Sequence, residues 1–341
     1  MKLGCFYPNI NDYTSFYRGH GVLCEIPKIV SNFEAVNLSQ CSWGTLKDKD
    51  IIFFQRPFRN SEKENEVEAV RLCKLYNKKV WVDYDDLLLD CPDHIPITKI
   101  HGKKQINENI KNIISKADLV TVSTEKLKEY LQPFSCKSEI VVVPNAWDNY
   151  MFPLSTRHTC KPMTKTVLWR GSDTHKPDLM KHEKDIVETI NAFPDFKFIF
   201  MGYNPSFITT KIKQKNVVLI AGADIGLYME YLNATPAYLV IVPLDNIPLN
   251  QCKSNVAALE ASWAGAHCLA PNWPEWQHAL IDTYDVDKEG SFKEKLFENL
   301  SNFDKSISAE ANWEWVKTER LLSQTNGIRV NLLSKLINGG I

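Results

Sequence analysis

Short apolar runs alternate with helical patterns along the first 150 residues. Runs of about five apolar residues between turn residues fit buried strands, whereas apolar positions spaced three and four apart fit amphipathic helices. Strands are predicted at 2–7, 50–54, 79–83, 118–122 and 139–143, and helices at 61–76, 105–116 and 124–131. Because strands that alternate with helices pair in parallel through crossover connections, this part is predicted to be a doubly wound α/β domain.

A second alternation follows residues 149–165, where proline, threonine, histidine and lysine interrupt the pattern and indicate a linker. Strands are predicted at 166–170, 196–201, 217–221, 238–243 and 268–270, and helices at 178–192, 225–232, 254–264, 292–303 and 309–336. We therefore expect an α/β protein with two Rossmann-like doubly wound domains, over 1–150 and 166–305, and helices over 306–341 that pack back toward the first. Two such domains in tandem are expected to face each other across a cleft at the carboxyl ends of their strands.

Composition narrows the class of protein. The 341 residues are 44% hydrophobic and 24% charged, which are globular values, and the net charge of −1 gives no general attraction to nucleic acid or anionic membrane. Nine cysteines without a C-x-x-C pair argue against a zinc cage or a disulfide framework and favour a reducing compartment. No run approaches the ~20 apolar residues of a membrane span. We expect a cytoplasmic protein without stable membrane insertion.

The segment 243–271 carries the clearest candidate chemistry. A predicted helix opens with Lys253-Ser254-Asn255, and Glu260 lies seven residues after Lys253, two turns further along the same face. A helix N-terminus with a lysine suits a diphosphate, and a carboxylate can accept hydrogen bonds from both ribose hydroxyls. The alternative is a solvated helix face with an N-cap serine. Small apolar neighbours favour the first interpretation, because an unpaired carboxylate among them is costly.

The first strand of the second half ends in a second polar group. Gly171 permits close approach of a ligand to the backbone, Ser172 and Thr174 add hydroxyl donors, and Arg170 and His175 can neutralise phosphate. The alternative is an ordinary turn whose polar residues cap the next helix. Parallel strands of one sheet end at the same edge, so this turn and the 243–271 segment are predicted to bind one donor.

Residues 238–271 resemble the donor-binding segment of GT-B glycosyltransferases of the family 4 (group 1) type, which include phage-encoded enzymes. Glu260, with the small residues up to Gly265, matches their ribose-binding glutamate, while the acidic position eight residues earlier falls on Cys252. The run from Asn250 to Asn255 looks like a diphosphate-binding replacement. Weaker matches lie at 117–125 and 143–146. The resemblance implies a GT-B fold and metal-independent sugar transfer from a nucleotide sugar, with UDP as the expected nucleotide and no cofactor.

Three carboxylates lie together at Asp83, Asp85 and Asp86, after a predicted strand. Because they repel one another, at least one is expected to have a raised pKa or a bound partner. Asp85 or Asp86 is the predicted base for an acceptor hydroxyl, with His101 a lesser candidate. The cluster also resembles the acidic position after the fourth strand of phage DNA glucosyltransferases. The alternatives are solvated, helix-capping acids and a metal-binding D-x-D.

A glycine-containing segment at 16–21 follows the first strand and is predicted to be a flexible turn. Its Arg18, Gly19 and His20 are candidates for contact with the donor phosphates once the cleft closes. A plain surface turn is the alternative.

The predicted function is sugar transfer in which Lys253, the helix end, and Arg170 or His175 stabilise the departing diphosphate. The alternatives are a metal-dependent D-x-D glycosyltransferase and a nucleotide-sugar or glycan-binding protein without turnover. The acceptor is either a surface or lipid-linked glycan or a hydroxymethylated base in phage DNA. Duplex DNA would require an extruded base and a phosphate grip, for which the basic runs at 99–104 and 211–215 are candidates.

Overall fold

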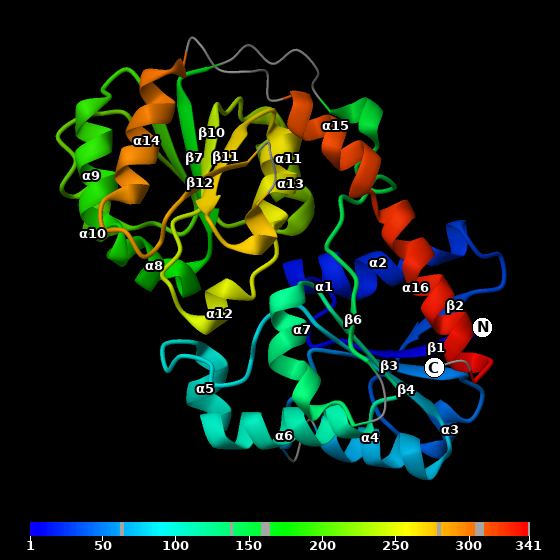
Figure 1. The fold of residues 1–341 in the computed structure, drawn as a ribbon. Helices are drawn as coiled ribbons and strands as arrows, with labels where there is room; N and C mark the ends of the chain where they lie inside the picture. Colours follow the sequence, from blue (N-terminus) through cyan, green and yellow to red (C-terminus); the bar gives the residue numbers. More distant parts are fainter. Residues whose placement is uncertain (62–64, 137–138, 158–163, 278–280, 304–309, 340–341) are drawn as a thin grey trace. The chain divides into compact units, whose positions relative to one another are not determined.

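The computed structural model describes the chain except residues 62–64, 137–138, 158–163, 278–280, 304–309 and 340–341. The chain divides into two compact units (Figure 1). The first unit contains Met1–Met151, Cys252–Ser254 and Leu321–Ile341, and the second contains Phe152–Gln251 and Asn255–Arg320. No helix in the described ranges combines the length and apolar character that crossing a membrane requires.

The first unit is built on a six-stranded parallel sheet with strand order β2-β1-β3-β4-β5-β6. Its strands are β1 (Lys2–Phe6), β2 (Glu34–Asn37), β3 (Ile51–Gln55), β4 (Lys79–Tyr84), β5 (Leu119–Val122) and β6 (Val141–Val142). Its α-helices are α1 (Tyr13–Arg18), α2 (His20–Cys24), α3 (Trp43–Leu46), α4 (Glu66–Leu75), α5 (Pro96–His101), α6 (Lys103–Lys116), α7 (Glu125–Leu131) and α16 (Leu322–Ile337). Side chains of α2 and α16 share one buried apolar cluster with β1 and β3.

The second unit repeats this architecture with strand order β12-β11-β10-β7-β8-β9, again all parallel. Its strands are β7 (Thr166–Gly171), β8 (Lys197–Gly202), β9 (Val217–Ala221), β10 (Leu239–Ile241), β11 (His267–Pro271) and β12 (Ile281–Tyr284). Its α-helices are α8 (Lys176–Lys181), α9 (Glu183–Ala192), α10 (Ser206–Thr209), α11 (Ile225–Ala234), α12 (Pro248–Gln251), α13 (Val256–Ala264), α14 (Ser291–Ser301) and α15 (Glu310–Glu319).

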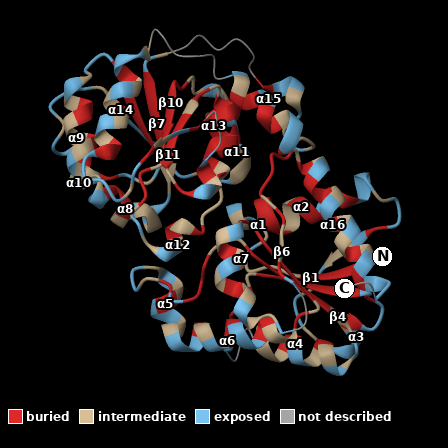
Figure 2. Ribbon diagram, in the orientation of Figure 1, coloured by how far each residue is buried: buried red, intermediate tan, exposed pale blue. Residues whose placement is uncertain are grey.

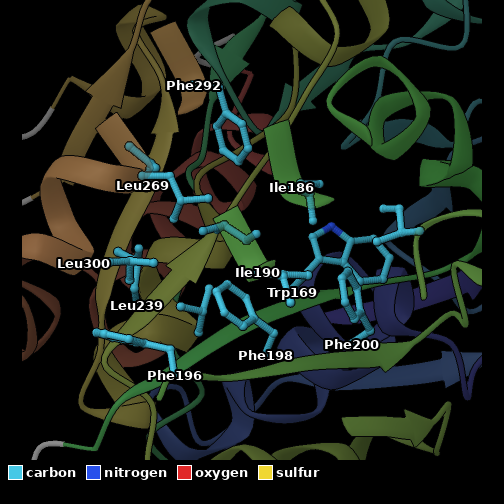
Figure 3. Close-up of a cluster of buried hydrophobic side chains, with 14 of the residues drawn as sticks. Trp169, Ile186, Ile190, Phe196, Phe198, Phe200, Leu239, Leu269, Phe292 and Leu300 are labelled. Atoms are coloured by element: carbon cyan, nitrogen blue, oxygen red, sulfur yellow. The ribbon is translucent and has the colours of Figure 1, made fainter. Parts of the chain in front are cut away.

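The apolar core of the second unit packs against the carboxyl-terminal half of β7. Trp169 packs with Phe198 and Phe200 of β8 and with Ile186 and Ile190 of α9 (Figure 3). The central strands of both sheets consist largely of buried residues (Figure 2). Because each buried aromatic or aliphatic side chain contributes about 1.5–3 kcal/mol, this packing holds the carboxyl end of β7 rigidly.

The predicted strands and long helices are present, with shifts of one or two residues at most strand ends, and two predicted helices are each divided. The helix expected over 178–192 begins at Lys176 and is interrupted at His182, between α8 and α9. The helix expected over 309–336 breaks at Arg320 and Leu321. As a result, only the part from Leu321 onward belongs to the first unit, whereas α15 stays in the second, where Trp313 packs on Trp263 at 5.5 Å between ring centroids.

Candidate functional site

In the sheet of the second unit, the order in which the chain adds strands reverses between β7 and β10. The chain begins at β7, adds β8 and β9 on one side, and returns to place β10, β11 and β12 on the other. In open parallel sheets, ligands bind outside the carboxyl ends of the strands at such a switch point. The turn after Gly171 and the loop after Ile241 therefore lie where a ligand is expected, and both contain residues predicted from the sequence to bind the donor.

Side chains from two other elements contact Glu260 on α13. The Arg170 guanidinium of β7 forms an ion pair with it, with 2.6 Å between Nε and Oε2. The Tyr228 hydroxyl of α11 donates a hydrogen bond of 2.8 Å to the same oxygen. Glu260 is only 3% exposed, so these partners compensate a buried charge. The sequence assigned Arg170 to phosphate and Glu260 to ribose, whereas the structure joins them to each other.

Asp178 organises the turn after β7 and the loop before α13. Its Oδ2 lies 2.9 Å from His175 Nδ1, and its Oδ1 accepts hydrogen bonds from the Asp245 main-chain N–H and from Asn250 Nδ2. Burial alone would raise the pKa of Asp178, but the hydrogen bonds from His175, Asp245 and Asn250 and the charge of His175 lower it overall. Asn250 is buried and fixes the loop instead of presenting its amide to solvent.

The other residues of this turn differ in exposure. Ser172 is exposed, and its hydroxyl lies 2.7 Å from that of half-buried Thr174, so both remain candidates for ligand contact. A Cβ at Gly171 would lie 2.9 Å from the Trp169 ring and 3.2 Å from the His175 ring. The glycine is therefore required by packing of the turn itself, independently of any ligand.

The Lys253-Ser254-Asn255 run is divided between the units. Residues 252–254 belong to the first unit, where Thr124 donates to the Cys252 carbonyl, and Asn145 Nδ2 donates to Ser254 Oγ at 2.6 Å. Lys253 Nζ lies 3.8 Å from Asp86. Burial raises the pKa of the Cys252 thiol to about 12, so it stays neutral and does not replace the carboxylate expected at this position.

Asn255 belongs to the second unit and fixes the start of α13. Its side chain donates to the Glu275 carbonyl at 3.0 Å and accepts from Arg320 at 2.7 Å. It is buried, and its amide is thus used within the protein, whereas the sequence had suggested donor binding. At the other end of α13, Gly265 adopts the left-handed conformation that ends the helix, at the residue that the sequence predicted.

Each predicted acid of the first unit has a cationic partner. Asp83 is 1% exposed and accepts from Arg18 Nε at 2.9 Å and Nη2 at 2.6 Å. Asp85 lies 2.9 Å from Arg56 Nε, and Asp86 accepts from Arg56 Nη2 at 3.1 Å. Burial, together with the charges of Asp86 and Asp83, raises the pKa of Asp85 to about 6 against the opposing charge of Arg56.

Arg56 directly follows β3, pairs with Asp85 and Asp86, and has a strained backbone. Its φ of 49° is in the left-handed region, which is uncommon for a residue other than glycine. Such strain persists only where surrounding contacts impose it, and it is concentrated at functional sites. Here the main-chain N–H of Arg56 donates to the Asp83 carbonyl at 2.8 Å while its side chain holds Asp85 and Asp86.

The 16–21 segment is not a flexible turn. Arg18 ends α1, Gly19 is the residue between helices, and His20 begins α2. Arg18 is 1% exposed and is occupied by Asp83, Asn145 and the Val143 carbonyl, so it is not placed to contact phosphate. A Cβ at Gly19 would meet Gln55 Oε1 at 2.1 Å, which explains the glycine by packing.

His20 and His101, both considered from the sequence, have aromatic neighbours. His20 is half-buried, stands edge-on to Tyr7 with 5.7 Å between ring centroids, and has Cys24 Sγ 3.3 Å from Nδ1. His101 stands edge-on to Phe58 at 5.4 Å. These contacts indicate packing roles for both rings.

Four functional candidates were missed by sequence reasoning: Arg56, Asn145, Asp178 and Tyr228. Each has at least one partner that is distant in the sequence, as Asp178 has in Asn250. Asn145 lies in the matched run 143–146, but that match does not indicate the hydrogen bond to Ser254. Within the described ranges, no group of three or more His, Cys, Asp or Glu side chains is arranged to hold a metal ion.

No protein-family model matches the chain, and no curated protein sequence matches it. Solved structures do. A sucrose-phosphate synthase from Thermosynechococcus elongatus matches with a TM-score of 0.70 at 12% identity, covering 99% of each chain. The chain has the GT-B fold. A glycosyltransferase from Rickettsia africae matches with a TM-score of 0.67 at 12% identity, covering 98% of each chain. An alpha-glucosyltransferase in complex with UDP and a DNA 13-mer matches at 0.64 and 12% identity over 98% of this chain and all of its own.

Proposed function

We propose that this GT-B protein is a glycosyltransferase that moves a sugar from a nucleoside diphosphate donor to an acceptor hydroxyl. The observation that carries the proposal is the buried Glu260 carboxylate, held by Arg170 and Tyr228 beside the switch point of the second sheet. A fixed carboxylate is suited to paired ribose hydroxyls, and His175 and the exposed hydroxyl of Ser172 lie on the neighbouring turn. The likeness to glycosyltransferases, one of them with UDP bound, supports the same assignment.

The reaction requires stabilisation of negative charge on the departing diphosphate. We assign this role to Lys253, with Ser254 as a neutral donor. Lys253 is 3.8 Å from Asp86, which is longer than a hydrogen bond, and its side chain is 23% exposed. Preorganised cations and N–H groups of this kind supply the main electrostatic contribution in group transfer. We therefore propose that the reaction requires no metal ion, which is supported by the use of Asp83 and Asp85 as partners of Arg18 and Arg56.

Asp85 is our candidate for the general base. Its pKa of about 6 lies close to neutral pH, where a base is both deprotonated and basic enough to accept a proton from the acceptor hydroxyl. Arg56 holds the carboxylate in place. This role applies to an inverting transfer, in which a hydroxyl attacks the sugar directly.

The acceptor class is proposed from the comparisons. We propose a hydroxymethylated base in DNA as the acceptor, and the support is the likeness to an alpha-glucosyltransferase solved with UDP and DNA 13-mers, one of which contains a HMU base. The described cysteines are free thiols, which supports action in the cytoplasm. The basic run 211–215 contributes less than its composition suggests, because Lys211 pairs with Glu183.

Incubation with radiolabelled UDP-glucose or UDP-N-acetylglucosamine tests the proposal. Hydroxymethylated duplex DNA, unmodified duplex DNA and a lipid-linked oligosaccharide serve as acceptors, with and without EDTA. We expect label on the hydroxymethylated duplex alone, unaffected by EDTA. Transfer only to the oligosaccharide would correct the acceptor, and loss of transfer in EDTA would correct the metal assignment. Tight UDP binding without transfer or hydrolysis would identify a binding protein instead.

A further inference from the structure

We propose that Arg170 and Tyr228 are positioning residues that hold Glu260 for the ribose, and that Arg170 is not a phosphate ligand. The inference rests on the proposed function, because it concerns the sugar-nucleotide site of the second unit. If the inference is right, the preference of the site for a ribose over a deoxyribose depends on Arg170, Tyr228 and Glu260 together.

The geometry constrains the Glu260 carboxylate at a single oxygen. Arg170 Nε lies 2.6 Å from Oε2, and the Tyr228 hydroxyl donates to the same atom at 2.8 Å. Arg170 comes from the end of β7, whereas Tyr228 comes from α11, which packs against α13. Two partners from different elements prevent the carboxylate from rotating. A hydrogen-bond acceptor fixed in this way loses little conformational freedom when a ligand binds.

The charges support the reassignment of Arg170. The Glu260 side chain is 4% exposed, and that of Arg170 is 22% exposed. Removing the cation from a buried carboxylate leaves an uncompensated charge, which is strongly unfavourable. A diphosphate would have to compete with Glu260 for the same guanidinium. Lys253, which lies 3.8 Å from its carboxylate neighbour Asp86, is a less committed cation for that role.

Tyr228 adds a neutral donor to the ion pair. A hydroxyl bound to a carboxylate is a charge-assisted hydrogen bond and is stronger than a neutral one. Tyr228 is 8% exposed, so its hydroxyl is directed to Glu260 within the protein. Removal of the hydroxyl should loosen the carboxylate without changing the charge balance of the site.

The test compares ligands that differ in one group. Dissociation constants for UDP, 2′-deoxy-UDP and UMP are measured by calorimetry on the full-length wild-type protein and on the variants Arg170→Met, Arg170→Lys and Tyr228→Phe. A hydrogen bond to a charged group predicts that wild type prefers UDP to 2′-deoxy-UDP by about 10- to 100-fold. We expect this preference to fall several-fold in Tyr228→Phe and nearly to vanish in Arg170→Met. The preference for UDP over UMP should not change in any variant.

Tyr231→Phe is the matched control, because Tyr231 lies one turn further along α11 and is half-buried. It should keep the wild-type ribose preference. Arg170→Met that lowers the UDP-to-UMP preference while keeping the ribose preference would overturn the inference and make Arg170 a phosphate ligand. If circular dichroism shows that Arg170→Met does not fold, the ribose preferences of Arg170→Lys and Tyr228→Phe test the inference in its place. A wild type that binds UDP and 2′-deoxy-UDP equally would refute the inference alone. No binding of UDP, ADP or GDP would refute the proposed function itself.

Discussion

Replacing Asp83 by asparagine should destabilise the first unit while preserving the size of the side chain. Asp83 and Arg18 form a two-pronged ion pair in which neither side chain exceeds 1% exposure. Thr121 donates to the same carboxylate, and Trp81 Nε1 donates to Thr121 at 2.8 Å. An amide in place of the carboxylate removes the negative charge and leaves Arg18 buried without a counterion.

The magnitude follows from the burial of the pair. Removing one partner of a buried ion pair costs about 3–5 kcal/mol. Asparagine retains one acceptor oxygen for Arg18, so we expect a value near the lower limit, about 3 kcal/mol. The charge of a second buried arginine, Arg329, also acts on Arg18, and Asp83 offsets both. Loss of the carboxylate therefore exposes two buried cations to each other.

Amide hydrogen exchange measured by mass spectrometry is the suitable assay, because a chain of two units need not unfold in a single transition. Peptides covering β4 and β5 report on the local free energy of opening. A loss of about 3 kcal/mol corresponds to exchange that is faster by roughly 100-fold. Peptides covering β7 and β8, in the second unit, should exchange as in wild type.

Glu68→Gln is the matched control. Glu68 accepts from Arg71 at 2.7 and 2.6 Å, distances like those at Asp83, but the two side chains are 43% and 53% exposed. Solvent screening makes such a pair nearly neutral for stability, so its exchange should not change. The reasoning fails if Asp83→Asn alters exchange of β4 and β5 by less than threefold, or if both variants have the same effect.

Three further predictions concern the charged groups of the first unit. Asp85→Asn should abolish transfer. In the wild type, kcat/KM should rise as pH increases through about 6, because a base must lose its proton and the pKa of Asp85 is raised to about 6, mainly by burial. A flat profile between pH 5 and 8 would contradict this. Lys253→Ala should weaken UDP binding at least tenfold in a calorimetric titration, and an unchanged dissociation constant would remove Lys253 from the donor site. Arg329→Met should keep or raise the thermal midpoint at pH 7.5, because burial, with the nearby charge of Arg18, lowers the pKa of Arg329 to about 9; a midpoint several degrees lower would refute that reasoning.

The periodicity of the sequence predicted the fold because it records which local segments bury one face. The parallel strands and their helices follow from apolar runs and amphipathic spacing, as at β9, whose bounds Val217–Ala221 match the prediction. Short helices such as α1 and α12 were not predicted, because four to six residues are too few to show a helical period. The break between α8 and α9 at His182 was not predicted either, because the helical spacing of apolar residues continues across it.

The residue types of the candidate site could be named from the sequence, but their contacts could not. Glu260, Lys253 and the acids after β4 were named by residue type and position, and their roles stay predictions. Their partners were not accessible to the same reasoning, because Arg18 and Asp83 are 65 positions apart and Asn145 and Ser254 are 109 apart. The roles suggested for Asn250 and Asn255 changed because both amides are buried and hydrogen-bonded within the protein.

The sequence by itself therefore indicated the longer helices and the described strands other than β2 and β12, and the residue types available for the proposed sugar-nucleotide site. Both depend on local patterns, which are readable without knowledge of distant contacts. Only the tertiary structure decided which charges pair: Arg170 with Glu260, Arg18 with Asp83, and Arg56 with Asp85. The physical reason is that the energy of an ion pair depends on distance and burial, and the order of the parallel strands, which brings these residues together, is not written in any local segment.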